Sequence, residues 1–255
     1  MGEDEEKSST DGLRIPEPPW RRAPRSAPRV PLTREAIVEA ALHVLDAEGM
    51  EGLSMRRVAE ELDTGAASLY WHVRNKEELL QLIYERVSDE VTLPEPDPSR
   101  WKEQGKALAL EMRAALKSHR DVARLSLGRL PSGPSLAVYS EWLFTLLKPV
   151  GIPDHVIAFL GDLFGLYVGA YAFEESLGFS SPTGEDLPPE QILEMFRSYM
   201  LSLPEDRFPY TRAAANLLFA GGPDERFEFG IDLILRGLES YANTSPPAGD
   251  HPHDE

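Results

Sequence analysis

The sequence predicts an all-α protein, with an N-terminal helix-turn-helix head of three helices and a C-terminal helical bundle. Apolar residues recur at intervals of three and four between residues 33 and 242, which is the period of a helix. In the same region we find no run of alternating β-branched residues that would predict a strand. A turn of three residues, Asp63 to Gly65, separates two short helical segments, which is typical of a helix-turn-helix.

Prolines indicate where the domains begin and end. Pro94, Pro96 and Pro98 cannot continue a helix, so we predict a head at residues 32–91 and a bundle at residues 97–242. Residues 1–31 are rich in proline, arginine and serine, and residues 243–255 are polar and contain prolines. Both ends are predicted to be disordered.

Charge is distributed unevenly along the chain. The net charge is −17, which opposes binding to nucleic acid when it is taken as a single number. Residues 12–34, however, carry six arginines against one glutamate, a net +5, whereas residues 1–11 carry five acids against one lysine, a net −4. Residues 12–34 form either a solvated linker or a basic arm that follows the minor groove of DNA. The role of the acidic leader stays open.

Composition excludes several kinds of site. The chain has no cysteine, and therefore no disulfide, thiolate metal site or cysteine nucleophile. Its acidic first residues are unlike a secretory signal. The longest apolar stretch, residues 156–171, contains Asp162 and is shorter than the roughly 18 residues of a spanning helix, so we predict no membrane segment. We expect a cytoplasmic protein without a metal or cofactor.

Capping residues and apolar spacing define the helices of the head. Thr33 is the predicted N-cap of the first helix, which ends at Gly49, and Ser54 is the N-cap of the second. Asn75, with Glu78 three residues later, resembles a capping box that begins a fourth helix. The apolar positions that define the first, second and fourth helices are Ile37, Ala40, Ala41, Val44, Leu45, Met55, Val58, Ala59, Leu62, Leu79, Leu80, Ile83, Tyr84 and Val87.

The third helix, about residues 66–73, carries side chains suited to DNA. Ser68, Tyr70, Trp71 and His72, followed by Lys76, suit phosphate oxygens, sugars and thymine methyl groups. Arg56, in the preceding helix, could donate two hydrogen bonds to a guanine. As alternatives, the two aromatic residues could cover the core of the head, and the histidine could be an ordinary surface residue. No metal is assigned to it.

Two segments of the head resemble the TetR family of transcriptional regulators. They are residues 52–59, GLSMRRVA, and residues 68–76, SLYWHVRNK. The resemblance implies that Arg56 reads a base and that Ser68 contacts phosphate or base. It also implies that Tyr70, Trp71, His72 and Lys76 position the DNA backbone or pack in the groove. Ala66 and Ala67 stand where the tetracycline repressor has glutamine and proline, so we expect a different operator.

The bundle is predicted to contain six helices, at residues 99–118, 121–129, 134–149, 153–178, 188–202 and 223–242. Glycines recur every fourth residue in the long helix, and each costs about 1 kcal/mol relative to alanine. They require either close approach of another backbone or room for a ligand. In the family this helix and the last helix form the interface of a homodimer, although the apolar stripe of the last helix could instead be core. The interface candidates are Gly161, Gly165, Gly169, Phe227, Ile231, Ile234 and Leu238.

The resemblance also implies a pocket for a small molecule in the bundle. Its candidate residues, which could instead be plain core, are Met112, Trp142, Phe144, Phe164, Tyr167 and Tyr171. The expected function is that of a repressor that binds a palindromic operator as a dimer and is released by a small-molecule effector. The alternatives are a helical enzyme, using His119 with Asp121 or Glu174 with Glu175, and a protein-binding adaptor. We expect no enzyme, because no nucleophile motif, phosphate-binding loop or HExxH pair occurs.

Overall fold

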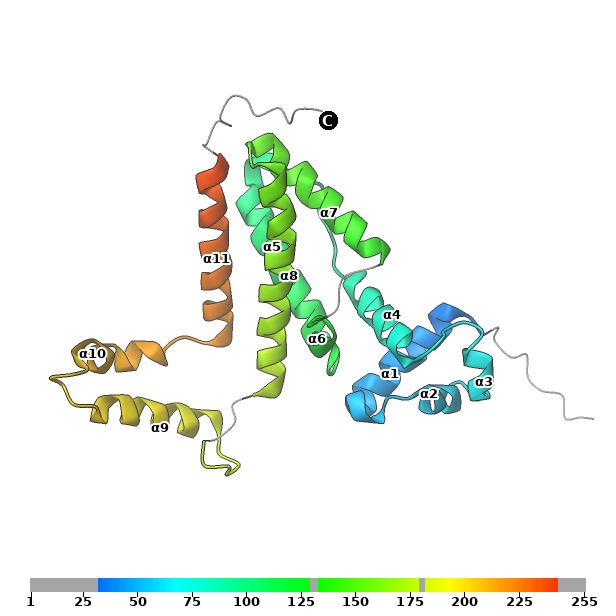
Figure 1. Cartoon of the computed structure of the whole chain (residues 1–255), viewed down its shortest axis with the longest axis horizontal. Helices are drawn as coiled ribbons and strands as arrows, with labels where there is room; N and C mark the ends of the chain where they lie inside the picture. The colour runs from blue at the N-terminus through cyan, green and yellow to red at the C-terminus, as the bar shows by residue number, and fades with distance from the viewer. Residues whose placement is uncertain (1–31, 129–132, 179–181, 243–255) are drawn as a thin grey trace, which may run out of the picture. The chain divides into compact units, whose positions relative to one another are not determined.

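The computed structural model describes residues 32–128, 133–178 and 182–242, and the regular structure in these ranges is helical throughout (Figure 1). The predicted all-α class is therefore confirmed. The predicted disorder of residues 1–31 and 243–255 concerns segments outside the described residues. The helices are α1 (Arg34–Gly52), α2 (Met55–Glu61), α3 (Ala66–Leu69), α4 (Lys76–Ser88), α5 (Trp101–Ser118), α6 (Val122–Leu125), α7 (Pro134–Leu147), α8 (Asp154–Leu177), α9 (Pro189–Ser202), α10 (Pro209–Leu218) and α11 (Pro223–Ala242).

The three predicted N-caps of the head are confirmed. The side chain of Thr33 accepts a hydrogen bond from the Ala36 amide at 3.1 Å, and Ser54 accepts one from the Arg57 amide at 3.1 Å. Asn75 accepts one from the Glu78 amide at 2.8 Å. These side chains satisfy amides that have no partner within the helix, and they fix where α1, α2 and α4 begin.

Apolar side chains from all four helices of the head meet in one core. Ile37 and Leu45 of α1, Val58 of α2, Leu69 of α3 and Ile83 of α4 are fully buried. Because α3 contributes Leu69 to this core, its other side chains are held at the surface in a fixed orientation. The short α3 thus depends on its neighbours for stability, since an isolated helix of this length would not form.

The body is built around α5 and α8, which pack against each other, with α11 on α5 and with α6 and α7 on α8. Five of the six predicted helices match α5, α7, α8, α9 and α11 to within about three residues at each end. The segment predicted as a helix at residues 121–129 is helical only from Val122 to Leu125.

Helix α10 was not predicted. It is short, with Pro209 at its start, and it lies between Pro204 and the pair Gly221 and Gly222, which favoured an interpretation as a loop. Proline is well tolerated in the first turn of a helix, because the amide it lacks would have no partner there. The segment packs against α9.

Helix α8 is long and apolar enough to cross a membrane by length and composition alone. Its most apolar window of 18 residues has a mean hydropathy of 1.7, and 39% of that window is buried inside the chain. The buried side packs on α5, α6 and α7. The other side is apolar and exposed, as described below.

Candidate functional site

The surface formed by α2, α3 and the turn between them is the first candidate site. Asp63 in this turn has a φ of 47°, a left-handed conformation that aspartate tolerates better than most residues. After Leu69 the chain continues in tight turns, with the amides of His72 and Val73 bonded to the Leu69 carbonyl. The turns extend the presented surface beyond the end of α3.

Two aromatic side chains on this surface are exposed to solvent. Trp71 is 89% exposed and Tyr70 is 52% exposed, whereas the neighbouring Leu69 and Val73 are fully buried. Leu69 and Val73 supply the apolar contact with the core of the head. The exposure of the two rings therefore argues against the alternative that they cover this core, and leaves them available to a partner.

Arg56 lies on the same part of the head. Its side chain is 87% exposed, and its Nε donates to Glu60 Oε1 at 2.9 Å, one turn further along α2. Ala67 is exposed, while Ala66 and Ser68 are half-buried. Because the Arg56–Glu60 pair is exposed, it contributes little stability, and the guanidinium can change partner at small cost.

Lys76 and His72 are half-buried. The Nζ of Lys76 lies 3.5 Å from the carbonyl oxygen of Met50, and the His72 carbonyl accepts two hydrogen bonds from Arg34, each at 3.2 Å. Arg34 also pairs with Glu78 at 3.7 Å. It thus ties the start of α1 to the segment after α3, a role that the sequence analysis missed because the pair is 38 residues apart.

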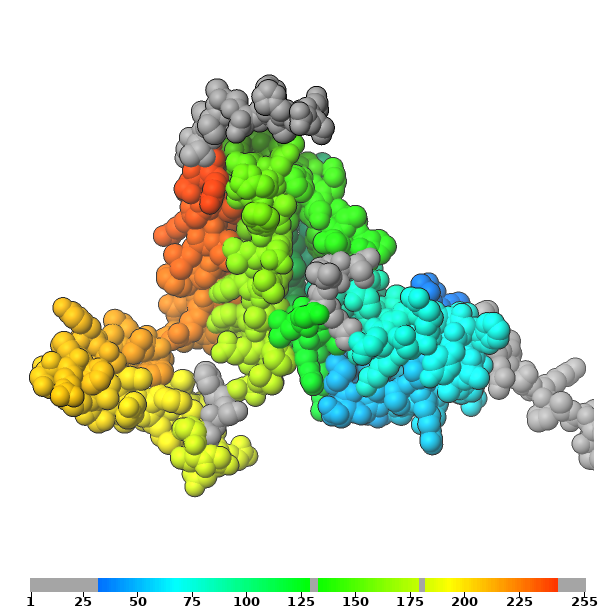
Figure 2. All heavy atoms as spheres, viewed as in Figure 1, coloured from blue at the N-terminus to red at the C-terminus, as the bar shows by residue number. Residues whose placement is uncertain are grey.

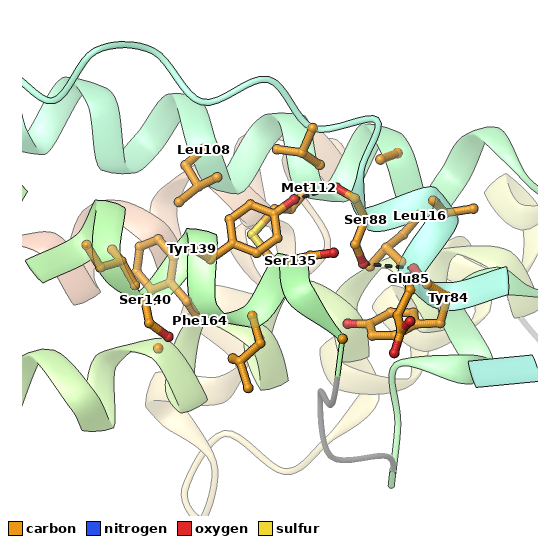
Figure 3. Close-up of a pocket in the computed structure, with 18 of the residues that line it drawn as sticks. Tyr84, Glu85, Ser88, Leu108, Met112, Leu116, Ser135, Tyr139, Ser140 and Phe164 are labelled. Atoms are coloured by element: carbon orange, nitrogen blue, oxygen red, sulfur yellow. Dashed lines mark hydrogen bonds between the residues drawn. The ribbon is translucent and has the colours of Figure 1, made fainter. Parts of the chain in front are cut away.

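A cavity of about 140 Å³ between α4, α5, α7 and α8 is the second candidate site. Figure 3 shows α4 supplying Tyr84, Glu85 and Ser88 at one end. Hydroxyl groups line the side formed by α4 and α7, and apolar side chains line the side formed by α5 and α8. The lining residues are Gln81, Tyr84, Glu85, Val87, Ser88, Val91, Leu108, Met112, Ala115, Leu116, Gly133, Ser135, Leu136, Tyr139, Ser140, Leu143, Gly161, Phe164 and Gly165.

Two hydrogen bonds join α7 to the end of α4 beside this cavity. The hydroxyl of Tyr139 donates to the carbonyl of Ser88, and Ser135 Oγ donates to Asp89 Oδ1 at 2.7 Å. Burial, together with the negative charge of Asp89, raises the pKa of Tyr139 to about 12. Tyr139 is therefore a neutral hydrogen-bond donor at every physiological pH.

The structure brings together only part of the predicted ligand set. Met112 and Phe164 line the cavity, whereas Trp142, Phe144, Tyr167 and Tyr171 are not among its lining residues. Trp142 donates to the Pro94 carbonyl at 2.7 Å. Tyr167 and Tyr171 pack on Phe227 of α11. Their ring centroids lie 5.5 and 5.1 Å, respectively, from the centroid of the Phe227 ring. Sequence reasoning missed Tyr84 and Tyr139, because helical spacing does not tell which apolar face meets a void.

The glycines of α8 lie against elements of the same chain. Gly161 and Gly165 line the cavity, and a Cβ added at Gly169 would lie 2.3 Å from Ser126 Oγ. The first two thus leave room beside the helix, and the third permits close approach of the segment after α6. The atoms nearest to Gly169 belong to side chains, so the close approach of another backbone that the sequence suggested is not seen at this glycine.

The apolar side chains of α11 divide between two faces. Phe227 and Ile231 are fully buried and Leu238 nearly so, while Ile234 is half-buried. The predicted stripe is therefore largely core within one copy of the chain. A second face is exposed: Phe159, Leu163 and Leu166 of α8 are 71%, 48% and 54% exposed, and α11 adds Phe229 and Leu233. Figure 2 shows one side of α8 uncovered along most of its length.

Three of the four residues considered for an enzyme make structural contacts. His119 Nδ1 lies 2.8 Å from Asp46 Oδ2, and the Asp121 carboxylate accepts the Met50 amide at 2.8 Å. Glu175 pairs with Arg113 and with Lys117. Within the described part of the chain, no three or more His, Asp or Glu residues are grouped as metal ligands would be.

Comparison with known proteins decides between the interpretations. Residues 37–83 match the family model described as bacterial regulatory proteins of the tetR family, and residues 93–242 match the tetracyclin repressor-like C-terminal domain. The chain belongs to the TetR family. The two matched segments correspond to the head, with α1 to α4, and to the body, with α5 to α11.

Relatives of known function agree with this assignment. The HTH-type transcriptional repressor DrrR1 of Streptomyces coeruleorubidus is 35% identical, and the match covers 93% of this chain and 89% of DrrR1. The class C tetracycline repressor protein of Escherichia coli is 30% identical over 84% of this chain and 94% of that protein. This TetR family protein is thus a DNA-binding regulator of transcription.

Solved structures extend the likeness to the body. Apo ActR of Streptomyces coelicolor is 41% identical, with a TM-score of 0.75 over 84% of this chain and 97% of ActR. ActR in complex with actinorhodin has the same identity and TM-score, covering 84% of this chain and 98% of that one. The likeness includes the body, whereas the segments that carried the resemblance in the sequence lie in the head.

Proposed function

We propose that this TetR family regulator represses transcription by binding a palindromic operator as a homodimer, and that a small molecule in the cavity releases it. The observation that carries the proposal is the connection between the two candidate sites. Helix α4 begins at Lys76, a short turn after the exposed aromatic pair, and ends at Ser88 in the lining of the cavity. A change at one end of a rigid helix therefore reaches the other.

The head is proposed to place α3 in the major groove. Arg56 would hydrogen-bond to a base after its guanidinium leaves Glu60. Ala66, Ala67 and Ser68 would face the groove at the start of α3. Tyr70, Trp71, His72 and Lys76 would position the backbone or pack in the groove. The exposure of Trp71 and Tyr70 supports this assignment, because large aromatic side chains are costly to leave in water without a partner.

The ligand is proposed to be amphipathic, with an apolar body and a hydrogen-bonding edge. Its apolar body would contact Met112 and Phe164, and its polar edge would face Tyr84, Ser88 and Tyr139. A ligand that takes the Tyr139 hydroxyl as a donor would break its bond to the Ser88 carbonyl. Helix α4 would then shift, and the heads would no longer match two successive major grooves, which lie about 34 Å apart.

The dimer is proposed to form through the exposed apolar face of α8 and α11. Leu163→Glu should produce a monomer at concentrations where the wild type is a dimer, because a carboxylate would be buried without a partner. We expect the dissociation constant of the dimer to rise at least about tenfold, or 1.4 kcal/mol, in sedimentation equilibrium. Val138→Glu, at an exposed apolar position of α7, is the control. A Leu163→Glu protein that dimerises like the wild type would place the interface elsewhere.

Operator binding is tested by selecting sites from a random DNA library and measuring fluorescence anisotropy over a salt series with random DNA as competitor. The proposal predicts tight, selective binding that weakens as salt increases, because phosphate contacts release counterions. Tyr70→Ala should weaken it without changing the stability of the head, since the side chain is half exposed. Failure to select any site would contradict the proposed binding to a palindromic operator.

A further inference from the structure

The exposed apolar face of α8 and α11 carries one unpaired charge at each of its two edges. Asp162 is the only charged residue of α8 between Val156 and Tyr171, and its side chain is exposed. Arg236 of α11 is exposed as well. Among the residues that the structure describes, neither side chain has a hydrogen-bond or ion-pair partner. Two charges of opposite sign are thus unused within one copy of the chain.

Helical spacing places Asp162 on the edge of this face that is remote from α11. An α-helix turns by about 100° per residue, so Asp162 lies about 60° from Phe159 and about 40° from Leu166 around α8. Leu163, on the other flank of the face, lines a groove that α8 shares with α11. Gly161, on the near flank, lines the cavity between α4, α5, α7 and α8. The carboxylate therefore stands at the outer boundary of the apolar face.

Arg236 stands at the opposite edge, on the side of α11 that is remote from α8. It follows Phe229 by seven residues, about two helical turns, so the two side chains project in nearly the same direction. Ile234 and Gly237, by contrast, line the groove shared with α8. The face thus has an acidic edge on α8 and a basic edge on α11. The exposed apolar residues between the two edges are Phe159, Leu163, Leu166, Phe229 and Leu233.

The two charges lie at nearly the same height along the body. Helices α8 and α11 run side by side in opposite directions (Figure 1). They meet where the Tyr167 hydroxyl donates to the Phe227 carbonyl at 3.1 Å, beside Gly230. From Tyr167, Asp162 is five residues back along α8, and from Gly230, Arg236 is six residues forward along α11. At about 1.5 Å per residue, their heights therefore differ by less than about one turn.

A second copy that covers this face in a two-fold dimer can pair the charges in only one orientation. An axis that runs parallel to α8 brings the α8 edge of one copy onto the α11 edge of the other at the same height. Asp162 of each copy then meets Arg236 of the other copy. An axis across the helices instead brings the α8 edge onto the α8 edge, and α8 has no lysine or arginine. In that orientation the carboxylate has no cation to bind.

We propose that Asp162 and Arg236 form two symmetry-related ion pairs between copies, and that these pairs select a second copy of this chain as the partner in one orientation. The inference rests on the proposed function, because it uses the proposed dimer face. A carboxylate on a covered apolar face costs free energy unless a cation pairs with it, so a related chain without the arginine is disfavoured as a partner. The paired orientation also keeps both heads at the same end of the dimer, where one duplex can reach them.

Charge reversal tests the ion pairs in the full-length chain. Asp162→Arg places two guanidinium groups against each other, and Arg236→Asp places two carboxylates against each other, in both pairs. Each variant should raise the dissociation constant of the dimer at least about tenfold in sedimentation equilibrium at low salt. The double variant Asp162→Arg/Arg236→Asp should dimerise like the wild type, because it exchanges the two charges. Both side chains are exposed within one copy, so circular dichroism should show an unchanged fold.

Mixing the two single variants distinguishes ion pairs between copies from an ion pair within one chain. In a mixed dimer of one Asp162→Arg chain and one Arg236→Asp chain, both contacts join opposite charges. If each homodimer is weakened tenfold, about nine in ten dimers should be mixed, against about half for random assortment. Native mass spectrometry of chains with tags of different mass measures this fraction. A mixed fraction of about half would overturn the proposal, even if the double variant dimerises like the wild type.

Glu111→Arg is the matched control. Glu111 of α5 is exposed and lies outside the apolar face, and its reversal changes the net charge by as much as Asp162→Arg does. It should leave dimerisation unchanged, and an equal loss in this variant would assign the effect to net charge. Single variants that dimerise as tightly as the wild type would also reject the ion pairs. Leu163→Glu decides separately on the face: if that protein stays dimeric, the proposed dimer face is wrong, whereas a monomer beside unaffected charge variants rejects the ion pairs alone.

Discussion

Arg56→Ala is expected to lower the affinity for the selected operator by about 1–3 kcal/mol, roughly 5- to 150-fold, and to relax specificity at one base pair of each half-site. The exposed guanidinium loses only its pair with Glu60, so the head should unfold as the wild type does. Anisotropy titrations against the operator and against operators changed at single positions measure both effects.

The control for Arg56 is an exposed arginine with a similar pair in the body. Arg197 of α9 binds Glu194 three residues before it, with Nε to Oε2 at 2.7 Å. Arg197→Ala removes one positive charge, as Arg56→Ala does, and should leave specificity unchanged. An equal loss of affinity for operator and random DNA in Arg56→Ala would show that Arg56 contacts phosphate rather than a base.

Arg113→Ala is expected to lower the free energy of unfolding by about 3 kcal/mol, because it leaves the largely buried carboxylate of Glu175 with only the partly exposed Lys117 as its partner. Arg113 of α5 is 6% exposed and binds Glu175 of α8 and Asp224 of α11, with contacts of 2.5 and 2.7 Å. Its guanidinium also lies 4.7 Å from the centre of the Phe227 ring. One side chain therefore joins three helices of the body. Urea denaturation at fixed protein concentration measures the loss.

The same ion pair gives stability a defined dependence on pH. Burial alone would raise the pKa of Glu175, but hydrogen bonds from Arg113 and Lys117 and their positive charges outweigh it and hold that pKa below its ordinary value. Because the pKa of Glu175 is lowered in the folded state, the stability that this ion pair contributes is fully present above the ordinary pKa of about 4.3. It is lost as pH falls through the pKa that Glu175 has in the folded protein.

In Arg113→Ala the dependence on pH should be weaker in the acid range, because the pKa of Glu175 is no longer held down by the guanidinium. Lys148→Ala, which breaks an exposed pair with Asp154, should cost no more than about 1 kcal/mol and serves as the control. A loss in Arg113→Ala as small as that of the control would mean that water replaces the guanidinium at Glu175.

The parts of the fold that depend on local sequence could be predicted, and those that depend on packing could not. Thr33, Ser54 and Asn75 cap their helices through residues three positions away, so the sequence alone located them. Helix α10 lies between helix-breaking residues, so the local sequence favoured a loop there. The helix packs on α9, and this contact could not be predicted from the local sequence. The head surface was predicted because residues 52–59 and 68–76 resemble the TetR family and carry side chains suited to DNA.

The cavity and the proposed interface were harder to predict, because the long helices of the body have two apolar faces. In α11 the stripe through Phe227 and Ile231 is core, while Leu233 is exposed on another face. In α8, helical spacing places Phe164 and Tyr167 on the same side of the helix. Phe164 nevertheless lines the cavity, whereas Tyr167 packs on α11. Only the positions of the neighbouring helices decide between these faces.

The most direct test of the account measures one ligand twice, with and without operator. A compound that raises the melting temperature of the protein is first found by screening, beginning with actinorhodin because ActR was solved with it. Its affinity is then measured by calorimetry for the free dimer and for the dimer saturated with operator. The account predicts that operator weakens ligand binding by the same factor by which ligand weakens operator binding. Equal ligand affinity with and without operator would contradict it.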